Sequence, residues 1–220
     1  MININRIHLY SEWEQACYRE IESVILSDSE KKNIALSGGS TPIPIYKRIG
    51  NMLESLPESK IERVRFFLVD ERDVSIESSR SNSAMIMNTI GRDFVVPFDP
   101  RELSPEEYYR KMCQELDVTD VFDLVVLGCG EDGHTASLFP KTSLLIEKSS
   151  SFMKNQLPSG ELRYSMTFSL INSAKKRVVF VNDNTEKEKY FNTALLKARS
   201  HPIHKVLSTP NTQVIIHEAL

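Results

Sequence analysis

The sequence predicts an α/β domain with an open sheet, because short apolar runs typical of buried strands alternate with segments of helical periodicity. Two of the apolar runs lead directly into glycine-rich loops, and a third leads into a cluster of charged residues. Open α/β sheets bind ligands at the carboxyl ends of their strands. We therefore expect these three loops to face one common crevice.

Length and composition limit the possible classes of protein. With 220 residues, of which 40% are hydrophobic, the chain can bury one substantial core, and we expect a single domain over residues 1–220. The net charge of -3 and the scattered Lys and Arg residues argue against nucleic-acid binding. No apolar run approaches the roughly 18 to 20 residues of a membrane-spanning helix, and the three cysteines form no CxxC pair. We expect a cytoplasmic protein that is a monomer or a weak dimer.

The amino-terminal half is expected to alternate strands and helices. Strands are predicted from their β-branched and aromatic content over residues 4–9, 33–37 and 64–69. Ser11 and Glu14 have the spacing of a capping box and predict the start of the first helix. A later helix is expected after Ser81 or Asn82, since either side chain can cap it.

The carboxy-terminal half continues the same pattern. Strands are predicted over residues 122–127, 164–170, 177–181 and 212–216. Ser104, Pro105 and Glu107 mark a helix start, and residues 186–198 have helical periodicity. Residues 149–160, which are rich in Ser, Lys and Pro, are expected to form a loop.

The loop after the strand at residues 33–37 has the composition of an anion-binding site. Gly38 and Gly39 expose consecutive backbone N–H groups, and Ser40 and Thr41 add hydroxyl donors at the predicted start of a helix. Such a loop is suited to the oxygens of a phosphate group. We therefore predict that Gly38, Gly39, Ser40 and Thr41 bind phosphate.

Four charged residues, 70–73, follow the strand at residues 64–69. A charged cluster at a strand end is usually a solvated turn. This one occupies the same strand-end position as the glycine loops, so we expect Asp70 and Arg72 to face the crevice. Arg163 and Lys187 are separate basic residues that can reach a phosphate.

The third loop, LGCGEDGHTASLFP at residues 127–140, contains His134, whose side chain titrates near neutrality. A histidine can deprotonate water for attack on a carbonyl, while a nearby cation stabilises the oxygen that gains charge. The three loops together suit hydrolysis or isomerisation of a small phosphorylated substrate. Neither metal-ligand spacing of histidines nor a GxSxG motif is present, so we expect no metal and no serine nucleophile.

Four blocks resemble the 6-phosphogluconolactonase family, which is related to the glucosamine-6-phosphate isomerases and deaminases, and the resemblance spans nearly the whole chain. They are LSGGSTP at residues 36–42, DER with the trailing SSRSN at 70–82, the loop at 127–140, and weaker segments near Arg163 and Lys187. Similar deaminases carry a GHIAF-type stretch and a DEY-type cluster. Arg72 and the residues at 134–139, HTASLF, therefore favour the lactonase.

The resemblance implies a three-layer, modified Rossmann fold with a mostly parallel sheet, of the sugar-phosphate isomerase and deaminase type. It implies hydrolysis of 6-phospho-D-glucono-1,5-lactone to 6-phospho-D-gluconate, without a cofactor. His134 would be the general base and Arg72 would orient or polarise the lactone. Asp70 would orient a neighbour or a sugar hydroxyl, whereas the matching aspartate of deaminases takes part in proton transfer. The phosphate would be held by the loop at 38–41, Arg163 and Lys187.

Two other functions stay open on the sequence. A deaminase or isomerase would act on glucosamine 6-phosphate, and a non-catalytic sensor would bind a sugar phosphate without turnover. The intact DER and GHTASLF segments argue against lost catalysis. Three residues depart from the family pattern, namely Lys141, Asn184 and His217.

Overall fold

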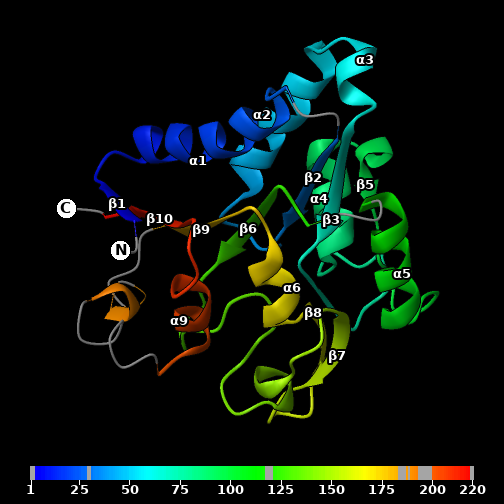
Figure 1. Cartoon of the computed structure of the whole chain (residues 1–220), viewed down its shortest axis with the longest axis vertical. Coiled ribbons are helices and arrows are strands. Elements are labelled where there is room, and N and C mark those ends of the chain that lie inside the picture. Colours follow the sequence, from blue (N-terminus) through cyan, green and yellow to red (C-terminus); the bar gives the residue numbers. More distant parts are fainter. Residues whose placement is uncertain are drawn as a thin grey trace.

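The computed structural model describes residues 3–28, 31–116, 121–182, 187, 189–192 and 200–218. Within them, the chain forms a seven-stranded sheet with a smaller three-stranded sheet beside it (Figure 1). The seven strands are all parallel, in the order β1-β10-β9-β6-β2-β3-β5. Their bounds are β1 Asn3–Ile7, β2 Lys32–Leu36, β3 Val64–Leu68, β5 Val95–Val96, β6 Leu124–Gly128, β9 Lys176–Asn182 and β10 Thr212–His217.

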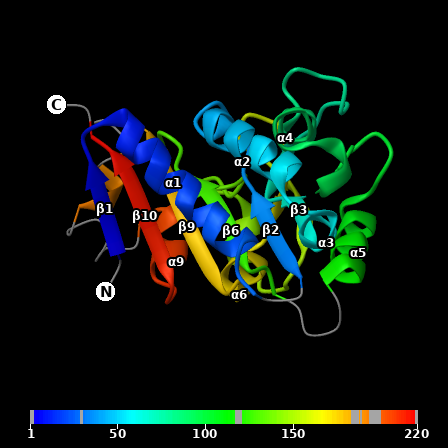
Figure 2. The same cartoon turned by 90° about the horizontal axis from the view of Figure 1, so that it is seen from above.

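Helices cover both faces of the large sheet, which confirms the predicted three-layer α/β arrangement. In Figures 1 and 2, α1 and α2 lie on one side of the sheet and α6 and α9 on the other. The helices are α1 Tyr10–Ile25, α2 Ile43–Ser55, α3 Glu58–Ile61, α4 Asn82–Ile90, α5 Pro105–Leu116, α6 Phe168–Ser173 and α9 Pro202–Leu207. Short 3-10 helices span Arg92–Phe94, Ser143–Ile146 and Lys189–Phe191.

The sheet is buried because both of its faces are covered. Every residue of β2 is buried, as expected for a parallel strand that packs against helices on two sides. Helix α1 buries a stripe at helical spacing, and the indole Nε1 of Trp13 donates to the carbonyl of Ile215 at 3.2 Å. One hydrophobic cluster extends from Trp13 to Ile216. The single domain over residues 1–220 stays a prediction.

The smaller sheet consists of three antiparallel strands in the order β4-β8-β7. Its strands are β4 Asp70–Arg72, β7 Phe152–Gln156 and β8 Leu162–Met166. The prediction of a loop at residues 149–160 is wrong, because residues 152–156 form a paired strand in which Phe152 and Asn155 are buried. The strand predicted at 164–170 ends at Met166, since the Thr167 side chain caps α6. In the charged cluster, Asp70–Arg72 form strand β4 rather than a turn.

Helix caps were predicted with mixed success. The prediction of a capping box at Ser11 and Glu14 is wrong. Helix α1 starts at Tyr10, and the residue before it, Leu9, makes no side-chain cap. Ser81 does cap α4, accepting the Ala84 N–H at 3.1 Å. The Ser104 hydroxyl likewise caps α5. The described residues leave out most of the helix predicted at 186–198. They also leave out Asn184, one of the residues that depart from the family pattern.

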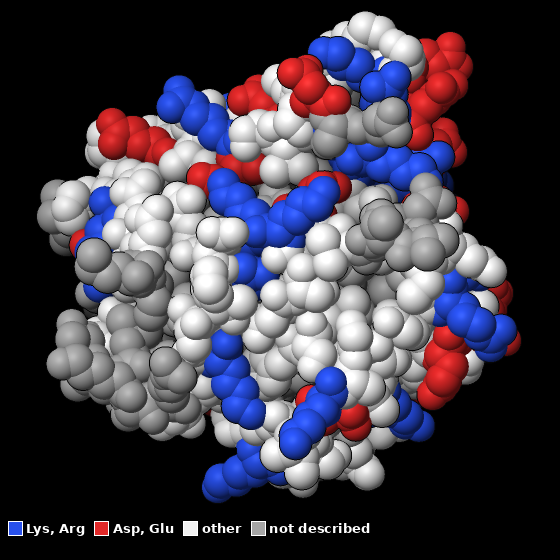
Figure 3. Space-filling model, in the orientation of Figure 1, with Lys and Arg blue, Asp and Glu red and all other residues white. Residues whose placement is uncertain are grey.

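The described surface has mixed charge on the face drawn in Figure 3. Lys and Arg side chains lie beside Asp and Glu over its upper part, and most of its lower part is uncharged. Among the described helices, none is long and apolar enough to cross a membrane.

We predict that Gly50→Ala destabilises the fold, because an added Cβ would lie 2.3 Å from the backbone oxygen of Thr89 where α2 crosses α4. Alanine gains roughly 1 kcal/mol of helix propensity over glycine, but forcing packed elements apart costs about 1–3 kcal/mol. Because the atom that the Cβ would meet belongs to the backbone, the cost should lie at the upper end of this range. The net loss in free energy of unfolding should then be about 1–2 kcal/mol in urea titrations. Gly128→Ala is the control, because none of the described heavy atoms lies within 4 Å of its added Cβ. Equal stability of Gly50→Ala and wild type would contradict the close helix crossing.

Candidate active site

A cavity of about 200 Å³ lies at the carboxyl ends of β2, β6 and β9. Its volume is below the ~300–1,000 Å³ of sites for drug-sized ligands, and so suits one small metabolite. The predicted site residues that line it are Gly38, Gly39, Thr41, Asp70, Arg72, His134 and Lys187. The structure therefore brings together the three loops that the sequence placed at strand ends. Ser40 and Arg163 are not among the lining residues.

His134 is held in a tight turn after β6. Its backbone N–H and its Nδ1 lie 3.1 and 2.5 Å from Asp132 Oδ1, and its ring stacks on Phe139 with centroids 3.9 Å apart. An added Cβ at Gly130 would lie 2.1 Å from the His134 ring, so this close packing requires glycine. Because Asp132 occupies Nδ1, the nitrogen left to exchange a proton is Nε2, which bonds to none of the described residues.

Asp70 is buried at the start of β4, and its carboxylate accepts a hydrogen bond from the Ser137 hydroxyl at 2.7 Å. Burial raises the pKa of the Asp70 carboxyl, while the Ser137 hydrogen bond and the charge of Arg72 oppose that rise. The bond joins β4 to the His134 loop. It therefore sets the position of one part of the site relative to another.

Glu71, between two residues of the cavity wall, is itself completely buried. Its Oε1 accepts the backbone N–H groups of Arg72 and Asn82, both at 2.8 Å. Its Oε2 accepts the Ser83 N–H at 2.7 Å and the Ser81 hydroxyl at 2.9 Å. Burial raises the pKa of the Glu71 carboxyl, and these four donors oppose the rise. The carboxylate thus ties β4 to the N-terminus of α4, where a negative charge is favoured.

The arginines near the cavity are held by the protein itself. Arg72 Nη1 donates to the carbonyl of Arg80 at 2.7 Å. Arg163 lies opposite Arg72 in the smaller sheet, but its Nη1 is 2.5 Å from Glu161 Oε1, which also binds Arg80 at 2.9 Å. Glu161 therefore engages one of the five N–H groups of the Arg163 guanidinium. Phosphate binding by Arg163 stays a prediction.

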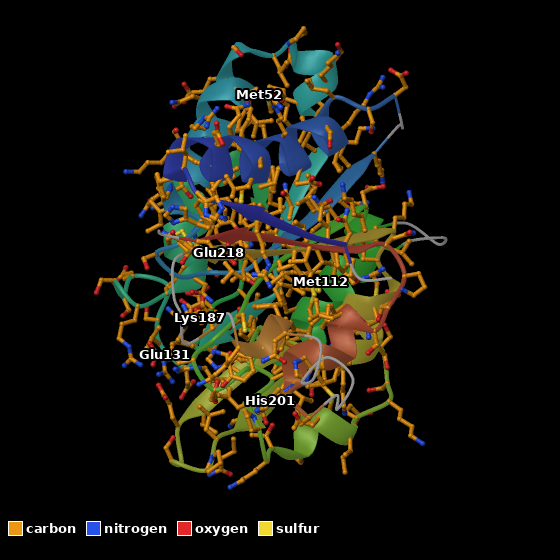
Figure 4. The ribbon with its side chains drawn as sticks, turned by 90° about the vertical axis from the view of Figure 1, so that its left-hand side faces the viewer. Met52, Met112, Glu131, Lys187, His201 and Glu218 are labelled. Carbon is orange, nitrogen blue, oxygen red and sulfur yellow. The ribbon has the colours of Figure 1, made fainter. Side chains whose placement is uncertain are left out.

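The loop predicted to bind phosphate follows β2 and precedes α2. Gly39 adopts a φ of +98°, which favours glycine, and the exposed Ser40 turns outward. Lys187 lines the cavity and also a shallower pocket beside Glu131 and Asp132. Figure 4 shows Lys187 and Glu131 on the same side of the molecule. The described cations of the cavity wall are therefore Arg72 and Lys187.

Several residues that shape the site were not singled out from the sequence as site residues. Asp132 has a local signal, since an aspartate two residues before a histidine can bond to its backbone and ring. Ser137 and Asn82 lie within blocks of the family resemblance, but their hydrogen bonds to Asp70 join residues 67 and 12 positions apart. Tyr190 is similar, and its hydroxyl donates to the Glu131 carbonyl at 2.7 Å, bracing the His134 loop.

Comparison with known proteins decides the family. A profile described as glucosamine-6-phosphate isomerases/6-phosphogluconolactonase matches residues 6–216, nearly the whole chain. The chain belongs to this family. The observed sheet and flanking helices agree with the fold implied by the resemblance in the sequence.

Similar members of the glucosamine-6-phosphate isomerase/6-phosphogluconolactonase family cover most of the chain. A probable 6-phosphogluconolactonase of Dictyostelium discoideum is 30% identical over 98% of this chain and 98% of that protein. The 6-phosphogluconolactonase of Chlamydia pneumoniae is 35% identical over 70% of this chain and 61% of that protein. Among solved structures, the enzyme of Trypanosoma cruzi has a TM-score of 0.85 at 25% identity, covering 99% of this chain and 94% of that one. The Thermotoga maritima enzyme has a TM-score of 0.77 at 25% identity, and the match covers 98% of this chain and 100% of that one.

We predict that Glu71→Gln destabilises the protein, because its side-chain NH₂ would face a backbone N–H in place of an accepting oxygen. Leaving buried donors unsatisfied costs roughly 1–3 kcal/mol each, so a loss of at least about 2 kcal/mol is expected in chemical unfolding. Glu106→Gln on the exposed surface of α5 is the control with the same chemical change. Unchanged stability of Glu71→Gln would show that the four hydrogen bonds do not stabilise the fold.

Proposed function

We propose that this protein hydrolyses 6-phospho-D-glucono-1,5-lactone to 6-phospho-D-gluconate, a reaction of the oxidative pentose phosphate pathway. The observation that carries the proposal is His134, which pairs with Asp132 and lines the same cavity as the cations of Arg72 and Lys187. A base beside cations suits attack of water on a carbonyl of an anionic substrate. The names of the similar proteins support the same reaction.

His134 is the general base of the proposed mechanism. Its Nε2 takes a proton from water while the water oxygen forms a bond to C1 of the lactone. The bond from C1 to the ring oxygen then breaks, and the proton on Nε2 passes to that oxygen, which becomes the C5 hydroxyl. Asp132 holds the ring through Nδ1 and stabilises the imidazolium between the two steps.

The two cations have separate roles in this mechanism. The Arg80 carbonyl holds one end of the Arg72 guanidinium, so that its remaining N–H groups are oriented for the carbonyl oxygen as it gains charge. Lys187 and the loop at residues 38–41 bind the 6-phosphate. Arg163 joins them through the guanidinium N–H groups that Glu161 does not engage.

The Ser137–Asp70 hydrogen bond supports the lactonase over the deaminase. The GHIAF-type stretch of similar deaminases has phenylalanine where this chain has Ser137, and a phenylalanine cannot donate to Asp70. In this chain one oxygen of the Asp70 carboxylate accepts the Ser137 hydroxyl, and its role is to hold the His134 loop. Ammonia release from glucosamine 6-phosphate would decide for the deaminase, and binding of 6-phosphogluconate without turnover would decide for a sensor.

The remaining expectations form part of the proposal. The reaction needs neither a metal nor a cofactor, because a histidine base and fixed cations supply the required proton transfer and charge stabilisation. The protein acts in the cytoplasm on a small molecule, as a single-domain monomer or weak dimer that binds no nucleic acid or membrane. Activity in the presence of a chelator, with sedimentation measurements, tests these points.

We predict that His134→Ala lowers kcat by about 100-fold or more, because general acid–base catalysis contributes roughly 10²–10⁴-fold. The assay follows lactone hydrolysis with the spontaneous rate subtracted. Added imidazole should restore part of the rate, since it can enter the space left by the ring. Full activity of the variant would exclude His134 as the base.

We predict that Asp132→Asn lowers kcat by about 10- to 1,000-fold with a small change in KM, since the orienting carboxylate of a histidine base contributes up to about 10⁴-fold. The amide leaves the imidazolium without its counter-charge. Asp93→Asn, at an exposed position of the 3-10 helix Arg92–Phe94, controls for the loss of one negative charge. Equal kcat values for the Asp132 variant and this control would remove Asp132 from the mechanism.

A further inference from the structure

Two buried polar atoms on the cavity wall have no partner among the described residues, namely Asn82 Oδ1 and Ser37 Oγ. Asn82 is 1% exposed and Ser37 is 7% exposed. A buried polar atom without a hydrogen bond destabilises the folded protein, so its presence at a site calls for a functional explanation. Both atoms belong to the elements that flank Gly38, which lines the same cavity.

The orientation of the Asn82 amide is set by the protein. Its Nδ2 donates to the backbone carbonyl of Asp70 at 2.9 Å, and its backbone N–H donates to Glu71. Turning the amide over would place Oδ1 against the Asp70 carbonyl, which is also an acceptor. The unpartnered atom is therefore an oxygen that can only accept a hydrogen bond.

Gly38 provides the space for this oxygen. A Cβ at position 38 would lie 1.8 Å from Asn82 Oδ1, and the φ of Gly38 is not in the left-handed region. Glycine is thus needed here for room rather than for backbone conformation. An amide oxygen repels the oxygens of a phosphate, so this part of the wall is suited to a donor, such as a sugar hydroxyl.

The same part of the wall lies near the reacting end of the site. Asn82 binds the backbone of Asp70, whose carboxylate binds Ser137 in the His134 loop. A lactone placed with its carbonyl at His134 has the C2 hydroxyl as the nearest donor to that carbonyl carbon. The Ser37 hydroxyl can also donate to this hydroxyl oxygen, since it has both a donor and acceptors.

We propose that Asn82 and Ser37 form a specificity subsite for the C2 hydroxyl of the lactone. Asn82 Oδ1 accepts from the hydroxyl, and Ser37 Oγ donates to its oxygen. The subsite rests on the proposed lactonase function, and it assigns to Gly38 the role of making space for a hydroxyl acceptor. It explains why two polar atoms are buried without partners on the wall of a sugar-phosphate site.

The test compares 6-phosphogluconolactone with its 2-deoxy analogue in wild type, Asn82→Ala and Ser37→Ala. Wild type should prefer the full substrate by about 10- to 100-fold in kcat/KM, because a site built for a hydroxyl leaves polar groups unpaired when that hydroxyl is missing. The preference should fall to about threefold or less in Asn82→Ala and should also fall in Ser37→Ala. Turnover of the 2-deoxy analogue should change little in the Ser37 variant, because this analogue lacks the hydroxyl that Ser37 contacts. A lost contact can thereby be told from a distorted active site, which would slow both substrates.

Ser37→Ala keeps the test decisive if Asn82→Ala fails to fold. Ser37 Oγ bonds to none of the described residues, so its removal should leave the urea midpoint unchanged or higher. A wild-type preference retained by the folded Ser37 and Asn82 variants would overturn the subsite. Failure of wild type to hydrolyse either lactone would instead overturn the proposed function. In that case the affinities for 6-phosphogluconate and its 2-deoxy form, measured by calorimetry on the same variants, would decide the subsite.

Discussion

The hydrogen-bonded carboxylate of Glu71 is the interaction on which the geometry of the site most depends. It ties the short strand β4 to the start of α4 through three backbone N–H groups and one hydroxyl. Successive side chains of a strand point to opposite sides, so burying Glu71 directs Asp70 and Arg72 toward the cavity. The same carboxylate fixes Asn82. One buried acid therefore sets the positions of three residues on the cavity wall.

Close packing against glycine is the second constraint on the site. The His134 ring lies against Gly130, and the Asn82 amide lies against Gly38. In both places a Cβ would occupy space that a polar side chain already fills. A glycine-rich loop is commonly interpreted only as room for a phosphate, but at these two positions an added Cβ would also meet the protein's own side chains.

The order of strands in the large sheet brings the functional groups together. The loops that carry Gly38 and His134 follow β2 and β6, which are neighbours in the sheet although about 90 residues apart in the chain. Arg72 follows β3 on the other side of β2, and Lys187 follows β9 beside β6. The cavity can therefore combine a glycine loop, a histidine and two cations from four separate segments, which no single segment could supply.

The sequence by itself determined the α/β class, most strands of the large sheet and the loops that carry His134, Gly38 and Arg72. These features are local, since apolar runs, glycine turns and cap residues act within a few positions of one another. Only the tertiary structure decided that β7 pairs where a loop was expected and that Arg163 lies opposite Arg72. It also decided that Ser137 bonds to Asp70 across 67 residues and that Asn82 lines the cavity. Such contacts depend on which strands become neighbours, and short-range periodicity carries no information about that choice.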